Sequence, residues 1–208
     1  MNSLSPQRPL LIVTIGIPGA GKSFFARRFS DTFAAPLVSF DEIRSTLFET
    51  AAHSSEEDFV VARIAGLQLR ELFKSKKTVI IDGGHNPKVS RMELGRVART
   101  HGYDVLYIWV QADERIAKSR ALHRHGNKAD DSYNRSLTEE EFALHAKRFT
   151  PPLANENVAV VSGHHTYATQ ARTILKRIAT PHDTPQKPAP KRPTTQPPTQ
   201  GRRSVTIN

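Results

Sequence analysis

One short motif near the N-terminus constrains the fold of this chain more than any other feature. Residues 16–23 read GIPGAGKS and match the phosphate-binding pattern G-x-x-x-x-G-K-[ST]. The apolar, β-branched run Leu10–Ile15 precedes the motif, and Ser23–Phe33 follows it with a phenylalanine at every fourth position. A strand, a glycine-rich loop and a helix in this order are the context that the pattern requires. The motif therefore predicts an α/β fold whose first loop binds phosphate.

The residue types of this loop explain the expected chemistry. Glycines let the backbone curl so that successive N–H groups and the helix N-terminus point at phosphate oxygens. Lys22 would reach the β- and γ-phosphates, and the Ser23 hydroxyl would coordinate Mg²⁺. An ordinary glycine turn is the alternative, which the flanking strand and helix make rarer. The residues expected to bind ATP here are Gly16, Pro18, Gly19, Ala20, Gly21, Lys22 and Ser23.

Hydrophobic patterning predicts the rest of the fold. The short, apolar and mostly β-branched segments expected to be buried strands are 37–40, 78–82, 105–110 and 158–161. The segments with helical patterns between and after them are about 54–74, 86–100, 113–123, 138–148 and 167–178. We expect Ser54, Asn86, Asp113 and Thr138 to cap the first four of these helices. Alternating strands and helices imply right-handed crossovers and a doubly wound parallel sheet with helices on both faces.

Composition divides the chain into three parts: a flexible N-terminus at 1–8, a domain at 9–180 and a tail at 181–208. The tail holds seven of the fourteen prolines, no Phe, Trp or Tyr, and five Lys/Arg against one Asp. Such a segment buries too little surface to offset its ordering entropy, so we expect a disordered basic tail. The whole chain carries a formal charge of +10, which suits phosphate anions and is compatible with nucleic acid. Weak contact of the tail with polyanions, or no role, is expected.

Several function classes are excluded by the composition. The chain has no cysteine, which excludes disulfides, thiolate metal sites and cysteine nucleophiles. No apolar run reaches the ~18 residues of a membrane span. The apolar run after Arg8 leads directly into the glycine-rich loop, so a buried strand explains it better than a signal peptide. The expectation is a soluble cytoplasmic protein with no membrane partner.

Carboxylates follow two of the expected strands. In an open parallel sheet, ligands bind beyond the carboxyl ends of the strands. Asp41 follows the second strand and Asp82 ends the third. We expect Asp41 to be the general base and Asp82 to bind Mg²⁺ through water, although either could instead be a helix N-cap. Arg44, one turn beyond Asp41, is expected to bind a phosphate on the acceptor, as is Arg91.

Arginines and a long loop follow the fourth strand. Arg120 and Arg124 are four residues apart at the end of a predicted helix, so we expect them to share one face. There they would bind the nucleotide's phosphates and stabilise the transition state, unless they form a solvated basic face. The polar stretch His125–Leu137, which includes Arg135 as a weaker candidate, is expected to be a lid or a passive surface loop.

Together these motifs resemble P-loop kinases related to the kinase domain of polynucleotide kinase and to zeta-toxin-like kinases. The matching segments are GIPGAGKS (16–23), SFDEIR (39–44), VIIDGGHNPKVSR (79–91), KSRALHRHG (118–126) and RFTPPL (148–153). The resemblance implies strand order 2-3-1-4-5, Asp41 as general base, Arg44 as acceptor-phosphate ligand, and Arg120 and Arg124 as lid arginines. The chain departs from the family's usual D-x-T-N at Gly83-Gly84-His85-Asn86.

Three functions follow from these observations. The leading one is an ATP- and Mg²⁺-dependent kinase in which Lys22, Asp41 and Arg124 are catalytic and the acceptor is a hydroxyl. That acceptor is left open between a polynucleotide 5′-hydroxyl, a nucleoside, a sugar or another small molecule. The second is a nucleotide-dependent switch with slow hydrolysis. The third is a nucleic-acid-binding NTPase, which predicts stimulation by DNA or RNA and steep salt dependence.

Overall fold

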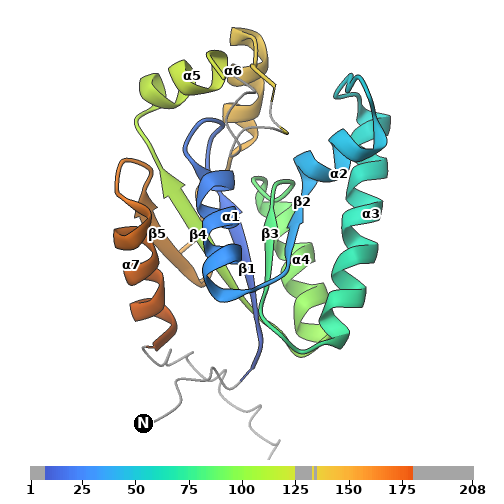
Figure 1. Ribbon diagram of the computed structural model, residues 1–208, viewed down its shortest axis with the longest axis vertical. Helices are drawn as coiled ribbons and strands as arrows, with labels where there is room; N and C mark the ends of the chain where they lie inside the picture. The colour runs from blue at the N-terminus through green and yellow to red at the C-terminus, as the bar shows by residue number, and fades with distance from the viewer. Residues whose placement is uncertain (1–7, 125–132, 134, 180–208) are drawn as a thin grey trace, which may run out of the picture.

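The five strands of the sheet all run parallel. They belong to a computed structural model of the chain, which describes residues 8–124, 133 and 135–179. The strands are β1 (Leu10–Ile15), β2 (Leu37–Ser39), β3 (Val79–Asp82), β4 (Asp104–Gln111) and β5 (Val158–Ser162). Their order across the sheet is β2-β3-β1-β4-β5, with β1 at the centre (Figure 1). The order implied by the resemblance is confirmed.

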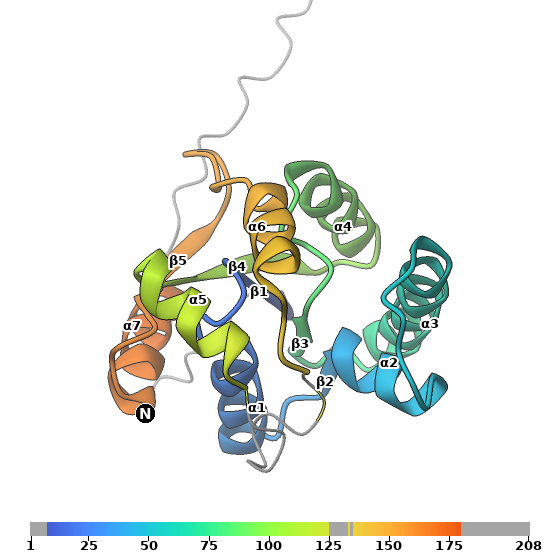
Figure 2. The same cartoon turned by 90° about the horizontal axis from the view of Figure 1, so that it is seen from above.

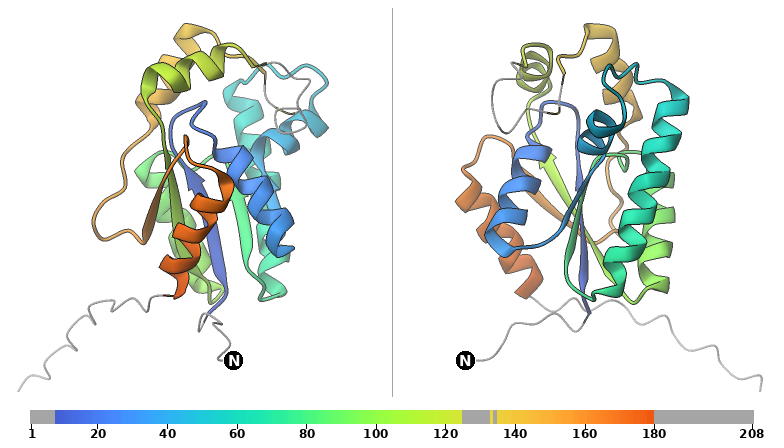
Figure 3. Two further views of the ribbon diagram at one scale, coloured as in Figure 1. Left: turned by 60° about the vertical axis from the view of Figure 1, so that its left-hand side comes forward. Right: turned by 45° about the vertical axis from the view of Figure 1, so that its right-hand side comes forward.

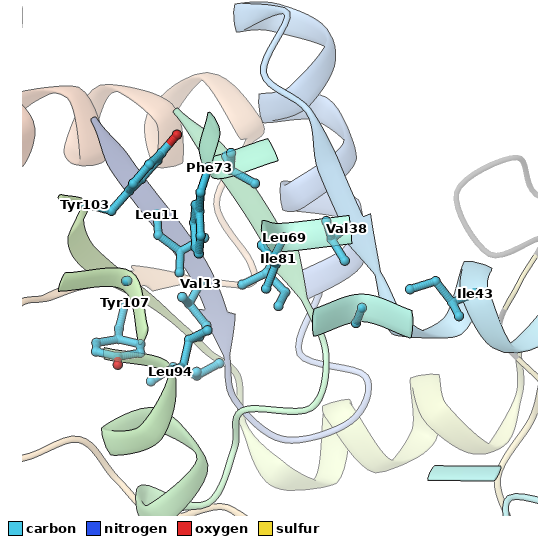
Figure 4. Packing of buried hydrophobic residues seen from close by; sticks show 14 of the residues in the cluster. Leu11, Val13, Val38, Ile43, Leu69, Phe73, Ile81, Leu94, Tyr103 and Tyr107 are labelled. Carbon is cyan, nitrogen blue, oxygen red and sulfur yellow. The ribbon is translucent and has the colours of Figure 1, made fainter. Parts of the chain in front are cut away.

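Helices cover both faces of the sheet because side chains of β1 alternate between two cores. Leu11 and Val13 pack in the core formed with α3 (Ser55–Lys74) and α4 (Lys88–Thr100), part of which Figure 4 shows. Leu10 and Ile12 pack on the opposite face, against α1 (Lys22–Phe33) and α7 (Tyr167–Ala179). Every residue of β1 is buried, as expected of a central strand covered on both sides. The predicted doubly wound α/β fold is confirmed.

Three shorter helices lie at the carboxyl edge of the sheet. They are α2 (Phe40–Leu47), α5 (Glu114–Leu122) and α6 (Glu139–Arg148). Viewed from above that edge, α5 and α6 lie over the end of β1, whereas α2 and α3 stand to one side (Figure 2). The turned views in Figure 3 show the same two groups of helices on either side of the loop after β1. Residues from both groups can therefore contribute to a site at this loop.

The helix caps test the local predictions. Thr138 caps α6 as predicted, and together with Glu141 it forms a capping box. The prediction that Asn86 caps α4 is wrong: the N-cap is Pro87 without a side-chain hydrogen bond, and the helix begins one residue later than expected. The Asn86 amide is used instead to bind the backbone of Gly16, and both groups of that amide are engaged there. A long-range contact thus replaces the local cap.

Some predictions fall outside the described residues. These are the N-terminal residues 1–7, most of the expected lid at 125–137, and the tail at 181–208. Within the part of the chain that the structure does describe, no helix combines the length and the apolar character needed to cross a membrane.

Candidate active site

The phosphate-binding loop, residues 16–23 (the P-loop), is packed closely against neighbouring backbone. Gly16 has φ +141° and Gly19 has φ +75°, which are conformations that side-chain-bearing residues rarely adopt. A Cβ at Gly16 would stand 2.5 Å from the carbonyl oxygen of Val110, and one at Gly19 would stand 2.0 Å from that of Ala117. The first glycine therefore lets the loop pass the end of β4, and the second lets it pass α5.

Lys22 begins α1, directly after the left-handed N-cap Gly21. Its ammonium donates a hydrogen bond of 2.9 Å to the carbonyl of Ile17, within the P-loop. Burial lowers the pKa of Lys22 to about 8, opposed by the negative charges of Asp82 and Asp41 and assisted by Arg124. An anion bound in the loop would favour the charged ammonium, because an opposite charge raises the pKa of a buried amine.

Asp82 is held beside β1 by the register of the sheet. In the parallel pair β1–β3, Thr14 lies opposite Asp82. The hydroxyl of Thr14 donates a hydrogen bond to the Asp82 carboxylate, and both residues are buried. Thr14 is a residue of the candidate site that sequence reasoning missed, although a lone hydroxyl in the apolar run LLIVTI was a detectable signal.

Asp41 lies in the first turn of α2 and is partly buried. Burial raises the pKa of its carboxyl, and the nearby charge of Asp82 raises it further. Arg124, Lys22 and Arg44 lower it, in that order of effect. These five charged groups come from α1, α2, β3 and the segment after α5, and their charges act on one another. The fold therefore brings the predicted base, the P-loop lysine and two of the predicted arginines, Arg44 and Arg124, to one place.

The alternative roles of the two aspartates as helix caps do not apply. The N-cap of α2 is Ser39, whose hydroxyl accepts a hydrogen bond from the backbone N–H of Glu42. The N-cap of α4 is Pro87, five residues beyond Asp82. Neither Asp41 nor Asp82 thus satisfies a helix terminus, which leaves both carboxylates for the site.

The donor set at the P-loop fits Mg²⁺. Ser23 offers a hydroxyl and Asp82 a carboxylate, the oxygen ligands that this hard cation prefers. Among the described residues, no three His, Cys, Asp or Glu side chains gather as a metal cage. A magnesium ion would therefore be held largely by phosphate and water oxygens, as is usual for this ion beside a nucleotide.

Arg120 and Arg124 do not share one helical face. Helix α5 ends at Leu122 and His123 is its C-cap, so Arg124 lies beyond the helix. Arg120 is exposed and donates over 3.4 Å to the carbonyl of Gly163, after β5. Arg124 instead acts on Lys22 and Asp41 through its charge. The i, i+4 argument was wrong because the helix stops between the two arginines.

Arg91 has a structural setting. Its side chain is completely buried, and its Nε donates over 2.7 Å to Glu156. Two further hydrogen bonds run from Nη1 to the carbonyl of Asn86 and from Nη2 to Glu156. The guanidinium thereby joins α4 to the segment before β5. This arrangement leaves it no surface for an acceptor, so the expectation that Arg91 binds one has no support here.

Arg44 is buried beside Asp41 but is already paired. Its Nη1 lies 3.0 Å from a carboxylate oxygen of Glu57, and its Nη2 pairs with Asp58. Both acids lie in the first turn of α3. Sequence reasoning placed Arg44 at the acceptor side but missed both of its carboxylate partners, because they lie in another helix.

Close packing explains why this chain has Gly83 and Gly84 where it departs from the D-x-T-N pattern of the kinases it resembles. Gly83 and Gly84 have φ of +101° and +75°. A Cβ at Gly83 would stand 2.8 Å from the Cβ of Phe40, and one at Gly84 would stand 2.5 Å from the Phe40 ring. Gly163 also approaches the P-loop, and sequence reasoning missed this glycine. A Cβ added at Gly163 would stand 2.1 Å from the carbonyl oxygen of Ala20. Glycine at these positions therefore lets neighbouring segments approach the site.

Comparisons with known proteins agree with this geometry. The AAA domain family model matches residues 11–152, so the chain belongs to this family. A shikimate kinase of Corynebacterium glutamicum is 32% identical over 112 residues, which cover 52% of this chain and 63% of that protein. The match thus spans less than two thirds of the curated relative's length.

Two solved structures show the same fold. The APS kinase CysC of Mycobacterium tuberculosis, in complex with AMPPNP and APS, has a TM-score of 0.61 at 16% identity and covers 84% of this chain and 100% of its own. A chain of the Pnkp1/Rnl/Hen1 RNA repair complex has a TM-score of 0.56 at 21% identity, covering 69% of this chain and 45% of its own. The fold is that of P-loop kinases, and the resemblance seen in the sequence motifs is confirmed.

Proposed function

We propose that this protein is an ATP- and Mg²⁺-dependent kinase that transfers the γ-phosphoryl group of ATP to a hydroxyl acceptor. The observation that carries the proposal is the position of Asp41. Its carboxylate is partly buried, does not cap the helix, and lies close enough to Lys22 and Arg124 for their charges to act on it. Binding a nucleotide requires the P-loop and a cation. A carboxylate poised beside them is needed when a hydroxyl must lose a proton.

The transfer assigns one role to each group. The acceptor oxygen forms a bond to the γ-phosphorus, the bond from that phosphorus to the β,γ-bridging oxygen breaks, and ADP leaves. Asp41 takes the hydroxyl proton, and its raised pKa makes it a stronger base than an exposed aspartate. Lys22 and the P-loop backbone hold the β- and γ-phosphates. Arg124 stabilises negative charge on the phosphoryl group in transit.

Magnesium would be held by Ser23 directly and by Asp82 through water. When bound, the ion neutralises charge on the β- and γ-phosphate oxygens. Thr14 contributes by orienting the Asp82 carboxylate through its hydroxyl. The chain itself thus supplies an ordered carboxylate and a hydroxyl at the metal position.

The relatives leave the acceptor undecided. They include a shikimate kinase, an APS kinase and a chain of an RNA repair complex. Fold similarity does not fix the acceptor, because acceptor recognition depends on individual side chains. The acceptor must be found by assay.

The decisive experiment follows label from γ-labelled ATP into a panel of 5′-hydroxyl oligonucleotides, nucleosides, sugars and water. Wild type is compared with Lys22→Ala and Asp41→Asn, and with Asp31→Asn as a matched control at an exposed position of α1. We expect transfer to one acceptor class, lost in the first two variants by a factor of about 10² or more and retained in the control.

Two other outcomes would overturn the proposal. Label released only to water, at a rate insensitive to Asp41→Asn, would favour the nucleotide-dependent switch. Hydrolysis stimulated by DNA or RNA, with steep salt dependence of binding, would favour the nucleic-acid-binding NTPase.

A further inference from the structure

The charged groups around Arg44, next to the proposed base Asp41, indicate which class of acceptor the site can bind. We call this part of the site the acceptor side. Arg44 is three residues beyond Asp41 on α2, and its charge acts on the Asp41 carboxyl. Its guanidinium is the cation nearest in sequence to the proposed base, and its side chain is only 9% exposed. Whether this cation is available decides whether an anionic group of the acceptor finds a partner there.

Glu57 occupies one side of the Arg44 guanidinium and is itself fixed in place. One of its oxygens accepts from the backbone N–H of Ala52 over 2.9 Å, and the other accepts from that of His53 over 2.7 Å. These bonds lower the pKa of Glu57 and keep it ionised. The carboxylate is anchored by backbone in addition to Arg44, so it cannot turn away without leaving two N–H groups unpaired.

Asp58 occupies the other side of the guanidinium and reaches the surface. Its side chain is 53% exposed, whereas that of Glu57 is 12% exposed. The trio of Arg44, Glu57 and Asp58 carries a formal net charge of −1. A phosphate placed at Arg44 would thus meet two carboxylates and one cation that they share. A hydroxyl could instead donate a hydrogen bond to the half-exposed Asp58 carboxylate.

A second cation near this corner is also neutralised. Arg135 is close enough for its charge to act on His53, and it forms a two-point pair with Glu141, whose pKa falls to about 2. On α6, burial lowers the pKa of His145, which favours the neutral imidazole. Because Arg44 and Arg135 are both paired with carboxylates, their surroundings favour hydrogen bonding over anion binding.

We infer that the acceptor is a small, neutral polyhydroxyl compound, such as a sugar, polyol or nucleoside, with one hydroxyl at Asp41 and a second bound by Asp58. This inference rests on the proposed kinase function. It reverses the role expected for Arg44, which here positions Asp58 and does not bind phosphate. Two hydroxyls held by two carboxylates would orient the acceptor toward the P-loop.

The test uses acceptors in matched pairs that differ by one phosphate: sugars and their monophosphates, and nucleosides and their 3′-monophosphates. For wild type we expect kcat/KM to be at least about tenfold higher for the neutral member. Asp58→Asn keeps the side chain's shape and removes its charge. It should raise KM for the neutral acceptor about tenfold and leave KM for ATP unchanged.

The same variant should also shift selectivity. With one carboxylate removed, kcat/KM for the phosphorylated member should rise at least about tenfold relative to the neutral member. Glu57→Gln provides a second variant with the same expected direction. Glu56→Gln is the matched control, because Glu56 lies in the same turn of α3 and is exposed, and it should change neither ratio.

The results separate the inference from the function on which it rests. Transfer restricted to phosphorylated acceptors or 5′-hydroxyl oligonucleotides, with no shift in Asp58→Asn, would overturn the neutral acceptor and leave the kinase standing. Absence of transfer to every acceptor, with ATP turnover unaffected by Asp41→Asn, would remove the kinase and this inference together.

Discussion

A buried histidine beside the site should make the protein sensitive to acid. His85 follows β3, and its ring meets that of Phe40 edge-on with centroids 5.7 Å apart. Both ring nitrogens are shielded from solvent. Burial lowers the pKa of His85 to about 4. The folded protein thus holds a neutral imidazole that the unfolded chain protonates at mildly acidic pH.

The size of this loss of stability at acidic pH follows from proton linkage. Between the ordinary histidine pKa of 6.5 and the folded value of about 4, the unfolded state binds more protons than the folded state. Stability therefore falls as the pH falls through this window, by about 1.4 kcal/mol per pH unit. The full effect is about 3 kcal/mol, of which about 2–3 kcal/mol is lost between pH 7 and pH 4.5.

The variant His85→Phe removes the titrating group and keeps a ring against Phe40. Urea unfolding would be measured at pH 7 and pH 4.5 for wild type, for this variant, and for His164→Phe, which replaces an exposed histidine after β5. Other groups titrate equally in all three proteins, so the difference between them isolates His85. We expect the loss on acidification to be about 2–3 kcal/mol smaller in His85→Phe than in the other two. Equal losses in all three would refute the reasoning.

Two further predictions concern packing around the site. Gly163→Ala should weaken ATP binding by about 10- to 100-fold, because its Cβ would overlap the Ala20 carbonyl and push the P-loop out of place. Gly66→Ala, where the added Cβ meets open space, should leave the ATP affinity measured by calorimetry unchanged. Arg91→Met should lower the free energy of unfolding by about 3–5 kcal/mol, since Glu156 loses its partner. A loss below about 1 kcal/mol in chemical denaturation would contradict this.

The parts of the site that could be predicted are those specified by local sequence. Glycine, lysine and serine spacing identified the P-loop, because the phosphate-binding conformation uses consecutive backbone groups. Asp41 and Asp82 were predicted from their place after strands, and a parallel sheet necessarily brings such strand ends to one edge. The strand order came from the resemblance, since periodicity alone does not say which strands are neighbours.

The parts that could not be predicted depend on contacts between distant segments. Arg91 pairs with Glu156, which is 65 residues away, and nothing local distinguishes it from an arginine that faces a ligand. Gly163 reads as a turn glycine until the P-loop is seen beside it. The separation of Arg120 from Arg124 depends on where α5 ends, and helix ends are the least certain part of a pattern. In each case the missing information was the neighbour, not the residue type.

The charged groups differ between the nucleotide side and the acceptor side of the site. On the nucleotide side, Lys22 and Arg124 form no ion pair within the described residues, so an incoming triphosphate finds cations whose charge is not yet neutralised. On the acceptor side, Arg44 is paired before any substrate arrives. Charges 4 Å apart interact by about 4 kcal/mol near a protein surface, so a pre-formed pair largely removes the attraction for a further anion. Glu57 and Asp58, in the first turn of α3, are therefore the residues that we propose make this protein prefer neutral acceptors over phosphorylated ones.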